Sequence, residues 1–306
     1  MRYTGPVTQE KNSLSWQGRC NRGFTLIELV IVIIIVGILA GVMAPLIALP
    51  VKGYIDQQRR GGLVDRAQTA LNIMSRELRL ALPKSVRIRT DGANYVMEFL
   101  RTASGGRYRA GGAGDPLSFD DALPDDNSFD VLGQIYCTGV SAGDYLSVGY
   151  NGSAIDGSAN VGYLGGLPTI KGTLTPITTC DTGTNKITFN NTAFPTDSES
   201  SNQRFYIVDT PITYLCNPIE GTIRRYHDYE IRDDQNDVDT HNDLTNNPGL
   251  PLTNPAESSL VIDSISDCIF SIELGGNQIS ASITVTDPDS SESVKLFEQI
   301  TIPNGL

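Results

Sequence analysis

The stretch RGFTLIELVIVIIIVGILAGVMAPLIALPV, residues 22–51, decides the fold of this 306-residue chain. Its last 23 residues, 29–51, carry no charge. A helix that rises about 1.5 Å per residue crosses a hydrocarbon core of about 30 Å in about 20 residues, so this run is long enough to span a membrane. An ordinary secretory signal has a shorter apolar core and a small-residue cleavage site after it, and neither feature is present.

Charge is divided unevenly along the chain. Residues 1–23 carry four basic side chains and one acidic side chain, a net charge of +3. The positive-inside rule therefore predicts that this end stays in the cytoplasm and that everything beyond residue 51 is exported. Residues 102–306 hold 9 basic and 28 acidic side chains. Such an acidic outer part disfavours nucleic acid and anionic lipid as direct ligands.

Glu28 is an acidic residue at the mouth of the apolar run, and Pro45 lies inside the run. A carboxylate at mid-bilayer costs about 2.5–3.5 kcal/mol on insertion scales and less near the interface. The charge pattern alone leaves open whether Glu28 is an interfacial carboxylate in a plain signal anchor or has a further role. Pro45 removes a helix hydrogen bond and predicts a kink or local melting of the helix.

Residues 52–82 continue the helix as an amphipathic segment, which Pro83 closes. Its apolar side chains recur at helical spacing, and we interpret them as core packing against a globular head. The stripe consists of Leu63, Ala67, Ala70, Leu71, Met74, Leu78 and Leu82. The two segments together predict one first helix of nearly 60 residues, half in a membrane and half under the head.

Residues 83–306 change to short β-forming runs separated by Gly, Pro, Asn and Asp. TDGAN at 90–94 predicts a turn between the first two strands, and DPDSSES at 287–293 predicts the link between the last two. SGGRYRAGGAGD at 104–115 predicts a flexible loop, and residues 233–259 predict a polar, mobile segment. The predicted fold class is α+β, with a long N-terminal α-helix packed on an antiparallel β-sheet head.

The cysteines agree with export, because the four that follow residue 23 form an even set in a compartment that oxidises thiols. Zinc is the rival interpretation, but no CxxC or nearby histidine pair supplies ligand spacing. Of three possible connectivities we prefer Cys137 with Cys180 and Cys216 with Cys268. The second pair is better supported, since both of its cysteines border apolar strand runs.

Catalytic motifs are hard to find. The chain has two histidines and no HExxH, GxSxG, Walker A or Rossmann glycine pattern, so we predict a structural protein without cofactors or catalytic residues. His227 alternates with bulky residues and is predicted to lie on a strand surface. A weaker alternative is Ca²⁺ bound by the acidic loop, whose spacing misses the EF-hand pattern. Its carboxylates are Asp233, Asp234, Asp237, Asp239 and Asp243.

RGFTLIE resembles the processing site of type IV pilins and type II secretion pseudopilins. The resemblance implies that a prepilin peptidase cuts after Gly23 and leaves an N-methylated Phe24, with Glu28 fifth in the mature chain. It also implies that Glu28 meets the Phe24 amine of a neighbouring subunit in a filament, where an unpaired buried charge would be prohibitive. Pro45 would add local flexibility. The leader of 23 residues is long for this family, which favours a start downstream of Met1.

Sequence segments in the head make the resemblance more specific. YVMEFL, SSNQRFYIVDTPITYLC and IRRYHDYEI look like segments of the O-type (MshO-like) minor pilins of the mannose-sensitive haemagglutinin (MSHA) pilus. This implies four parts: a leader peptide at 1–23, a filament-core helix at 24–51, an amphipathic helix at 52–82 and a periplasmic head at 83–306. The implied function is that of a minor pilin-like structural subunit in assembly or priming of an MSHA-type type IV pilus.

The implied partners are the prepilin peptidase, other major and minor pilins, the inner-membrane assembly platform and, before assembly, the lipid bilayer. The implied location is the bacterial inner membrane, with a single pass and a periplasmic head, and later the surface pilus. Three alternatives stay open: a minor pseudopilin of a type II secretion system, a tip adhesin, and a membrane-anchored periplasmic enzyme.

Overall fold

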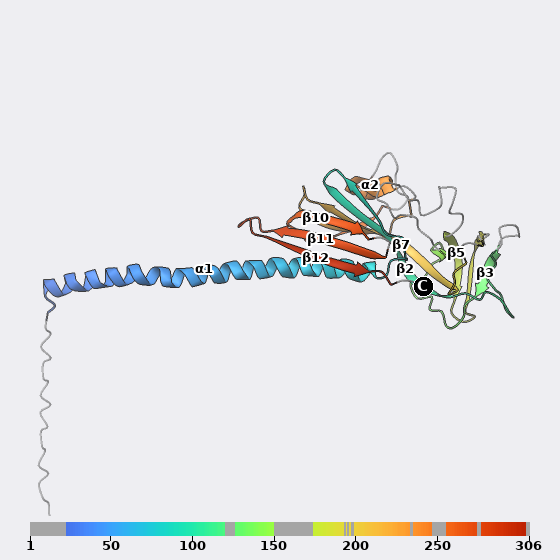
Figure 1. The fold of residues 1–306 in the computed structure, drawn as a ribbon, viewed down its shortest axis with the longest axis horizontal. Coiled ribbons are helices and arrows are strands. Elements are labelled where there is room, and N and C mark those ends of the chain that lie inside the picture. Colours follow the sequence, from blue (N-terminus) through green and yellow to red (C-terminus); the bar gives the residue numbers. More distant parts are fainter. Residues whose placement is uncertain are drawn as a thin grey trace, which may run out of the picture. The chain divides into compact units, whose positions relative to one another are not determined.

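The computed structural model describes residues 23–119, 126–149, 174–192, 194, 196, 199–232, 235–246, 255–273 and 277–303. The chain divides into two compact units, residues 1–57 and 58–306. One helix, α1 (Leu26–Leu78, 53 residues), belongs to both units (Figure 1).

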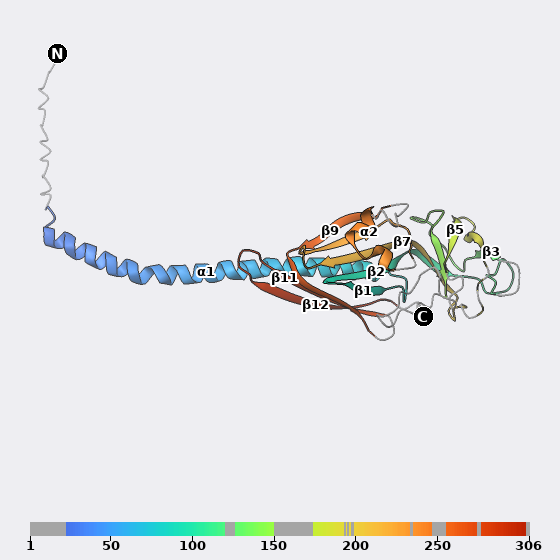
Figure 2. The same ribbon diagram turned by 90° about the horizontal axis from the view of Figure 1, so that it is seen from above.

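In the first unit, α1 is apolar on all sides from Leu29 to Val51, because the uncharged run leaves no polar face. Every side chain described between residues 24 and 57 is exposed. The helix is drawn as one continuous ribbon in Figure 2 and runs through Pro45 and Pro50 without interruption. The backbone therefore does not melt at Pro45, one of the two outcomes that the sequence predicted there.

In the second unit the predicted apolar stripe is buried. Ala67, Met74 and Leu78 are fully buried, and Leu63, Ala70 and Leu71 nearly so. The helix ends at Leu78, earlier than residue 82, where the stripe placed its end. The chain then turns, and Ala81 bridges to Arg101.

A nine-stranded antiparallel sheet forms the larger part of the head among the residues that the structure describes. Its order is β1-β2-β7-β4-β5-β6-β3, and β8 pairs with β7 and with β9. The strands are β1 (Arg87–Asp91), β2 (Asn94–Arg107), β3 (Asp126–Asp130), β4 (Tyr145–Val148), β5 (Leu174–Asp181), β6 (Lys186–Thr192), β7 (Arg204–Asn217), β8 (Thr222–His227) and β9 (Glu257–Asp263). The fourteen-residue strands β2 and β7 lie side by side and organise the sheet.

A second antiparallel sheet has three strands in the order β10-β11-β12. These strands are β10 (Ile265–Ile272), β11 (Gln278–Thr286) and β12 (Ser293–Thr301). Both predicted turns are confirmed, since β1 and β2 are joined at residues 92–93 and β11 and β12 at 287–292. Gly92 has a φ of 58°, which suits the first loop position of a hairpin turn of the primed type.

The largest core unites the head half of α1 with the inner faces of both sheets. It includes Met97 and Phe99 from β2, Ile212 and Tyr214 from β7, and Phe270, Ile279 and Ile283 from the smaller sheet. A second core lies among β3 to β7 around an aromatic cluster, in which Phe129 contacts Phe205 edge-on at 5.1 Å between ring centroids. The predicted α+β class, a long N-terminal helix followed by an antiparallel head, is confirmed.

The glycine-rich segment 104–115 differs from its prediction as a flexible loop. Strand β2 runs on through Arg107, and Tyr108 is fully buried in the second core and bridges to Val131. Gly105 is paired with Tyr206 on β7, and a Cβ atom there would lie 2.9 Å from a backbone oxygen of Phe205. The glycine therefore permits close strand approach rather than flexibility.

The polar segment 233–259 also differs from its prediction. Where it is described, it forms a 3-10 helix, η2 (Gln235–Val238), a short helix, α2 (His241–Asn246), and the start of β9. Val238 and Leu244 are fully buried in a small core that also contains Tyr226 and Tyr229. A few apolar residues among many acidic ones were sufficient to dock the segment on the sheet. Figure 1 shows α2 beside the strands of the head.

Candidate processing and assembly site

Helix α1 begins with a side-chain cap. The backbone N–H of Glu28 donates to Oγ1 of Thr25 at 3.3 Å, and the N–H of Leu29 donates to the Thr25 carbonyl at 3.2 Å. A threonine before the first helical residue satisfies a backbone donor that would otherwise lack a partner in the helix. Thr25 was not among the residues predicted to have a role, although T-x-x-E is the signature of a capping box.

Glu28 is exposed and lies in the first turn of α1. A negative charge there is favourable because the positive end of the helix dipole is at the N-terminus, a contribution of about 0.3–1 kcal/mol. The position therefore gives Glu28 a local stabilising role that does not require a neighbouring subunit. Its pairing with the amine of Phe24 in a neighbour stays a prediction.

The peptide bond expected to be cut precedes the helix. Gly23 and Phe24 have no helical structure, no other heavy atom lies within 4 Å of a Cβ placed on Gly23, and Phe24 is 81% exposed. An accessible, uncrowded peptide is what a protease requires. Cleavage after Gly23 would remove neither Thr25 nor its hydrogen bond to Glu28, so the helix cap would persist in the mature chain.

The helix behind this start is apolar and unburied. Among the described residues, α1 is the one helix that is both long enough and apolar enough to cross a membrane. None of its most apolar 18-residue stretch is buried. Ile33, Ile34 and Val36 are 63%, 56% and 57% exposed. Leaving so many large apolar side chains in water is unfavourable at about 25 cal/mol per Å², so this segment requires lipid or protein around it.

Pro45 belongs to this segment by its backbone, and its side chain lies outside the described residues. The helical backbone is continuous there, so its proposed role in local flexibility stays a prediction. Apart from the adjacent turns of its own helix, nothing in the chain lies within 4 Å of a Cβ placed on Gly37 or on Gly41, which leaves that helix face free for close approach by another helix.

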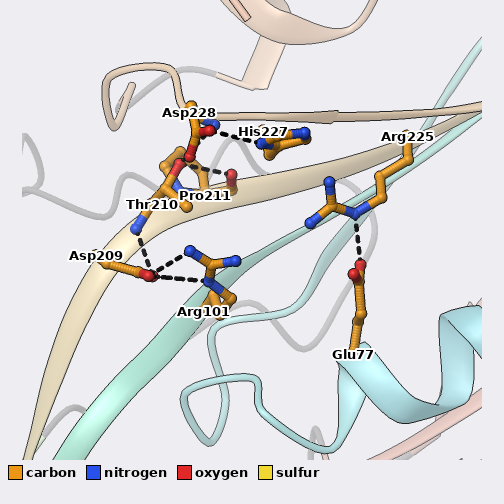
Figure 3. A network of polar contacts seen from close by, with 8 residues as sticks. All are labelled: Glu77, Arg101, Asp209, Thr210, Pro211, Arg225, His227 and Asp228. Atoms are coloured by element: carbon orange, nitrogen blue, oxygen red, sulfur yellow. Dashed lines mark hydrogen bonds and ion pairs between the residues drawn. The ribbon is translucent and has the colours of Figure 1, made fainter. Parts of the chain in front are cut away.

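In the head, the last turn of α1 is anchored by polar contacts. Glu77 Oε2 accepts from the Tyr214 hydroxyl at 2.6 Å and from Arg225 Nε at 2.7 Å, which joins the helix to β7 and β8; Figure 3 shows the contact with Arg225. Burial, with the Glu77 carboxylate beside it, raises the pKa of Tyr214. Arg66, farther back on α1, forms an ion pair with Asp263 of β9. These contacts fix the rotation of the helix against the sheet.

Both disulfides lie in the head and join the pairs that the sequence favoured. Cys137 is bonded to Cys180 beside the second core. Cys216 on β7 is bonded to Cys268 on β10, and both residues are fully buried in the largest core. The second bond links the two sheets covalently.

The acidic segment offers little support for Ca²⁺ in the described part. Asp239 is buried and its Oδ2 lies 2.9 Å from Nε of Arg89, so this carboxylate already has a cation. Asp233 and Asp234 lie outside the described residues, as does the side chain of Asp237. Asp243 Oδ2 accepts from Thr240 Oγ1. A Ca²⁺ site here stays a prediction.

Comparison with known protein families finds one match in this chain. Residues 18–44 match the prokaryotic N-terminal methylation motif, which covers the cleavage site, Glu28 and most of the apolar run. No curated protein and no solved structure matches the chain.

The motif and the fold together support a type IV pilin-like or pseudopilin-like protein with a pilin-like α+β fold. The motif implies processing by a prepilin peptidase and partners of the pilin type, and with the apolar helix it suggests membrane anchoring. It points to a structural subunit rather than an enzyme.

Proposed function

We propose that this chain is a minor pilin-like subunit that takes part in assembly or priming of an MSHA-type type IV pilus. The observation that carries the proposal is the N-terminal methylation motif on an apolar helix whose described side chains are exposed from Phe24 to the end of the run. A helix of this kind anchors the protein only while it lies in the lipid bilayer. In a filament, other pilin helices replace the lipid around it.

The proposed mechanism is a sequence of physical steps. Basic leader residues hold the N-terminus in the cytoplasm, and the peptidase cuts after Gly23. The new Phe24 amine and the Glu28 carboxylate of adjacent subunits then pair within the helical bundle. Because an unpaired buried charge costs several kcal/mol, a subunit in the wrong register is penalised more than the correct pair is rewarded. The protein performs no bond chemistry itself.

A minor rather than a major subunit is supported by the size of the head. The second compact unit extends over residues 58–306, which is bulky for an element repeated along a filament. Assignment to the MSHA system is supported by the head segments that resemble O-type minor pilins, among them residues 204–216 and 223–231.

Filaments provide the test. Shed fibres from a strain with a tagged chromosomal copy are analysed by mass spectrometry for the N-terminal peptide. We expect a low-abundance peptide that starts at N-methylated Phe24. Recovery of the chain with its leader, or its absence from fibres, contradicts the proposal.

The same strain separates the two filament systems. If the chain is an MSHA-type pilin, deletion of the MSHA assembly genes removes it from fibres, whereas deletion of the type II secretion genes does not. The reverse result favours a secretion pseudopilin.

A further inference from the structure

Three metal-ligating side chains meet where β8 ends and β9 begins. His227 is the last residue of β8, Asp228 follows it, and Glu257 is the first residue of β9 and the register partner of His227. Each offers one ligand atom, and these atoms all lie within 4.8 Å of one another. His227 Nδ1 and Asp228 Oδ2 are 2.8 Å apart.

A residue of the larger sheet hydrogen-bonds to the backbone of Asp228. Asp228 has a φ of 59°, a left-handed conformation that a side-chain-bearing residue rarely adopts. Its N–H donates to Oγ1 of Thr210 at 2.9 Å, and Thr210 is buried on β7. Thr210 in turn donates its N–H to Asp209, which accepts from Arg101 (Figure 3). The contact with Thr210 holds the backbone of Asp228, and the Asp228 carboxylate lies against His227.

Arg101 makes its ion pair with Asp209, behind Thr210, and the charge of Asp228 also acts on Arg101. Two carboxylates, those of Asp228 and Glu257, lie near the His227 imidazole. A bound cation would remove the repulsion between them.

We propose that His227, Asp228 and Glu257 form a Zn²⁺ site. Zn²⁺ binds imidazole nitrogen and carboxylate oxygen at about 2.0–2.2 Å, which places tetrahedral ligand atoms about 3.3 Å apart. The pair His227 and Asp228 is already within that distance, and rotation of the exposed Glu257 side chain brings in the third ligand. Ca²⁺ and Mg²⁺ fit less well because they require six or more oxygen ligands or several bound waters, and they do not favour imidazole.

The site has access to solvent and a structural consequence. The side chains of His227 and Asp228 are 21% and 49% exposed, so an ion can enter, and three protein ligands leave a fourth position for water. Strand β9 pairs only with β8 among the described strands. A metal shared by the end of β8 and the start of β9 would fasten this edge strand at its first residue. This inference does not depend on the proposed function.

The test uses the full chain in detergent, with metal removed by a chelator and Zn²⁺ alone as the probe. Cys20→Ser serves as the background, since a leader thiol could bind the metal. We expect one Zn²⁺ per chain by competition with a chromophoric chelator, and a thermal midpoint that rises by about 5–10 °C at 100 times Kd. Co²⁺ in place of Zn²⁺ should give an absorption spectrum of mixed nitrogen and oxygen ligation.

Two matched pairs of variants locate the site. His227→Ala and Glu257→Gln should each weaken Zn²⁺ binding by about tenfold or more, since each removes a direct ligand. The controls are His241→Ala, which changes the other histidine of the chain, and Glu273→Gln, which changes an exposed carboxylate just after β10. They should bind Zn²⁺ like the background protein. Equal affinity in all five proteins, equal losses in variants and controls, or no binding below about 1 mM Zn²⁺ overturns the proposal.

Discussion

Arg87 and Glu98 are register partners on β1 and β2 and form an ion pair inside the head, with Nε and Oε2 2.8 Å apart. Their side chains are 4% and 0% exposed. Tyr229 donates its hydroxyl to the other oxygen of Glu98 at 3.1 Å, and Arg87 Nη2 donates to the carbonyl of Arg232 at 2.9 Å. The pair thus connects the first hairpin with the segment after β8, and both of its charges have partners.

Removing both members of this pair should cost clearly less than the two single removals added together. Glu98→Leu or Arg87→Met leaves an uncompensated buried charge, so each should lower the free energy of unfolding by about 3–5 kcal/mol. The double variant should lose clearly less than the sum of the two. Urea unfolding of the full chain in detergent measures these values. Additive losses would show that the two charges do not stabilise each other.

Gly23→Val should block leader removal. The β-branched side chain would stand at the position that the peptidase is expected to recognise, next to the bond that it cuts. Pulse-labelled cells should then accumulate a chain that retains its 23-residue leader, and fibres should lack it. Gly53→Val, a glycine with equally open surroundings on α1, is the matched control and should be processed normally. Normal processing of Gly23→Val would refute the predicted cleavage site.

Substitution of Glu28 can separate its local role from its role between subunits. Glutamine can replace glutamate in a capping box but carries no charge. Glu28→Gln should therefore keep the helix start and leader removal, and lose incorporation into fibres almost as fully as Glu28→Ala. Thr25→Ala, by contrast, should weaken the cap by about 0.5–2 kcal/mol and leave incorporation largely intact. Full incorporation of Glu28→Gln would assign Glu28 to the cap alone.

Asp239 should make the segment η2–α2 sensitive to pH. Burial raises the pKa of Asp239 from 3.8 to about 6, opposed by Arg89 and assisted by Asp243 and Asp91. The folded state therefore binds a proton between pH 3.8 and about 6 that the unfolded chain has released, and the contribution of Asp239 to stability falls as pH rises through that window.

Amide exchange of residues 235–246 at pH values of about 4.5 and 7, on either side of the raised pKa, tests this effect. Protection should be greater at the lower pH in the native chain, and this difference should shrink in Asp239→Asn. Asp267→Asn, which changes a half-exposed carboxylate on β10, should keep the native difference. An unchanged pH dependence in Asp239→Asn would exclude Asp239 as its source.

Local patterns predicted those features that depend on nearby residues. The stripe from Leu63 to Leu78 predicts a helix because its spacing matches the helical period, and the apolar run predicts one because its length suits a membrane span. The turns at 90–94 and 287–293 were found because glycine and aspartate favour them. Strand β5 has no clear strand signal in its sequence, since LTPITTCD has proline, threonines and no regular alternation of apolar residues.

Features that depend on distant residues could not be predicted in the same way. Tyr108 is buried because β7, more than 90 residues away in sequence, pairs with the strand that ends just before it, and a glycine-rich sequence gives no sign of that. Glu257 lies opposite His227 because β9 pairs with β8, and part of the segment between these strands packs on the sheet through Val238 and Leu244. Of the candidate processing site, Gly23, Phe24 and Glu28 could be named from sequence, whereas Thr25 required the T-x-x-E spacing to be recognised.

The bond between Cys216 and Cys268 has a mechanical consequence. It ties β7 to β10 within the core that holds the stripe of α1, so the two sheets cannot part while the bond is intact. If the chain is assembled into a fibre, as proposed, traction on that fibre reaches the head through residues 58–78. Under optical tweezers, the reduced protein should release its helix at a lower force than the oxidised protein, so the oxidising compartment would set the tensile strength of the subunit before it ever leaves the cell.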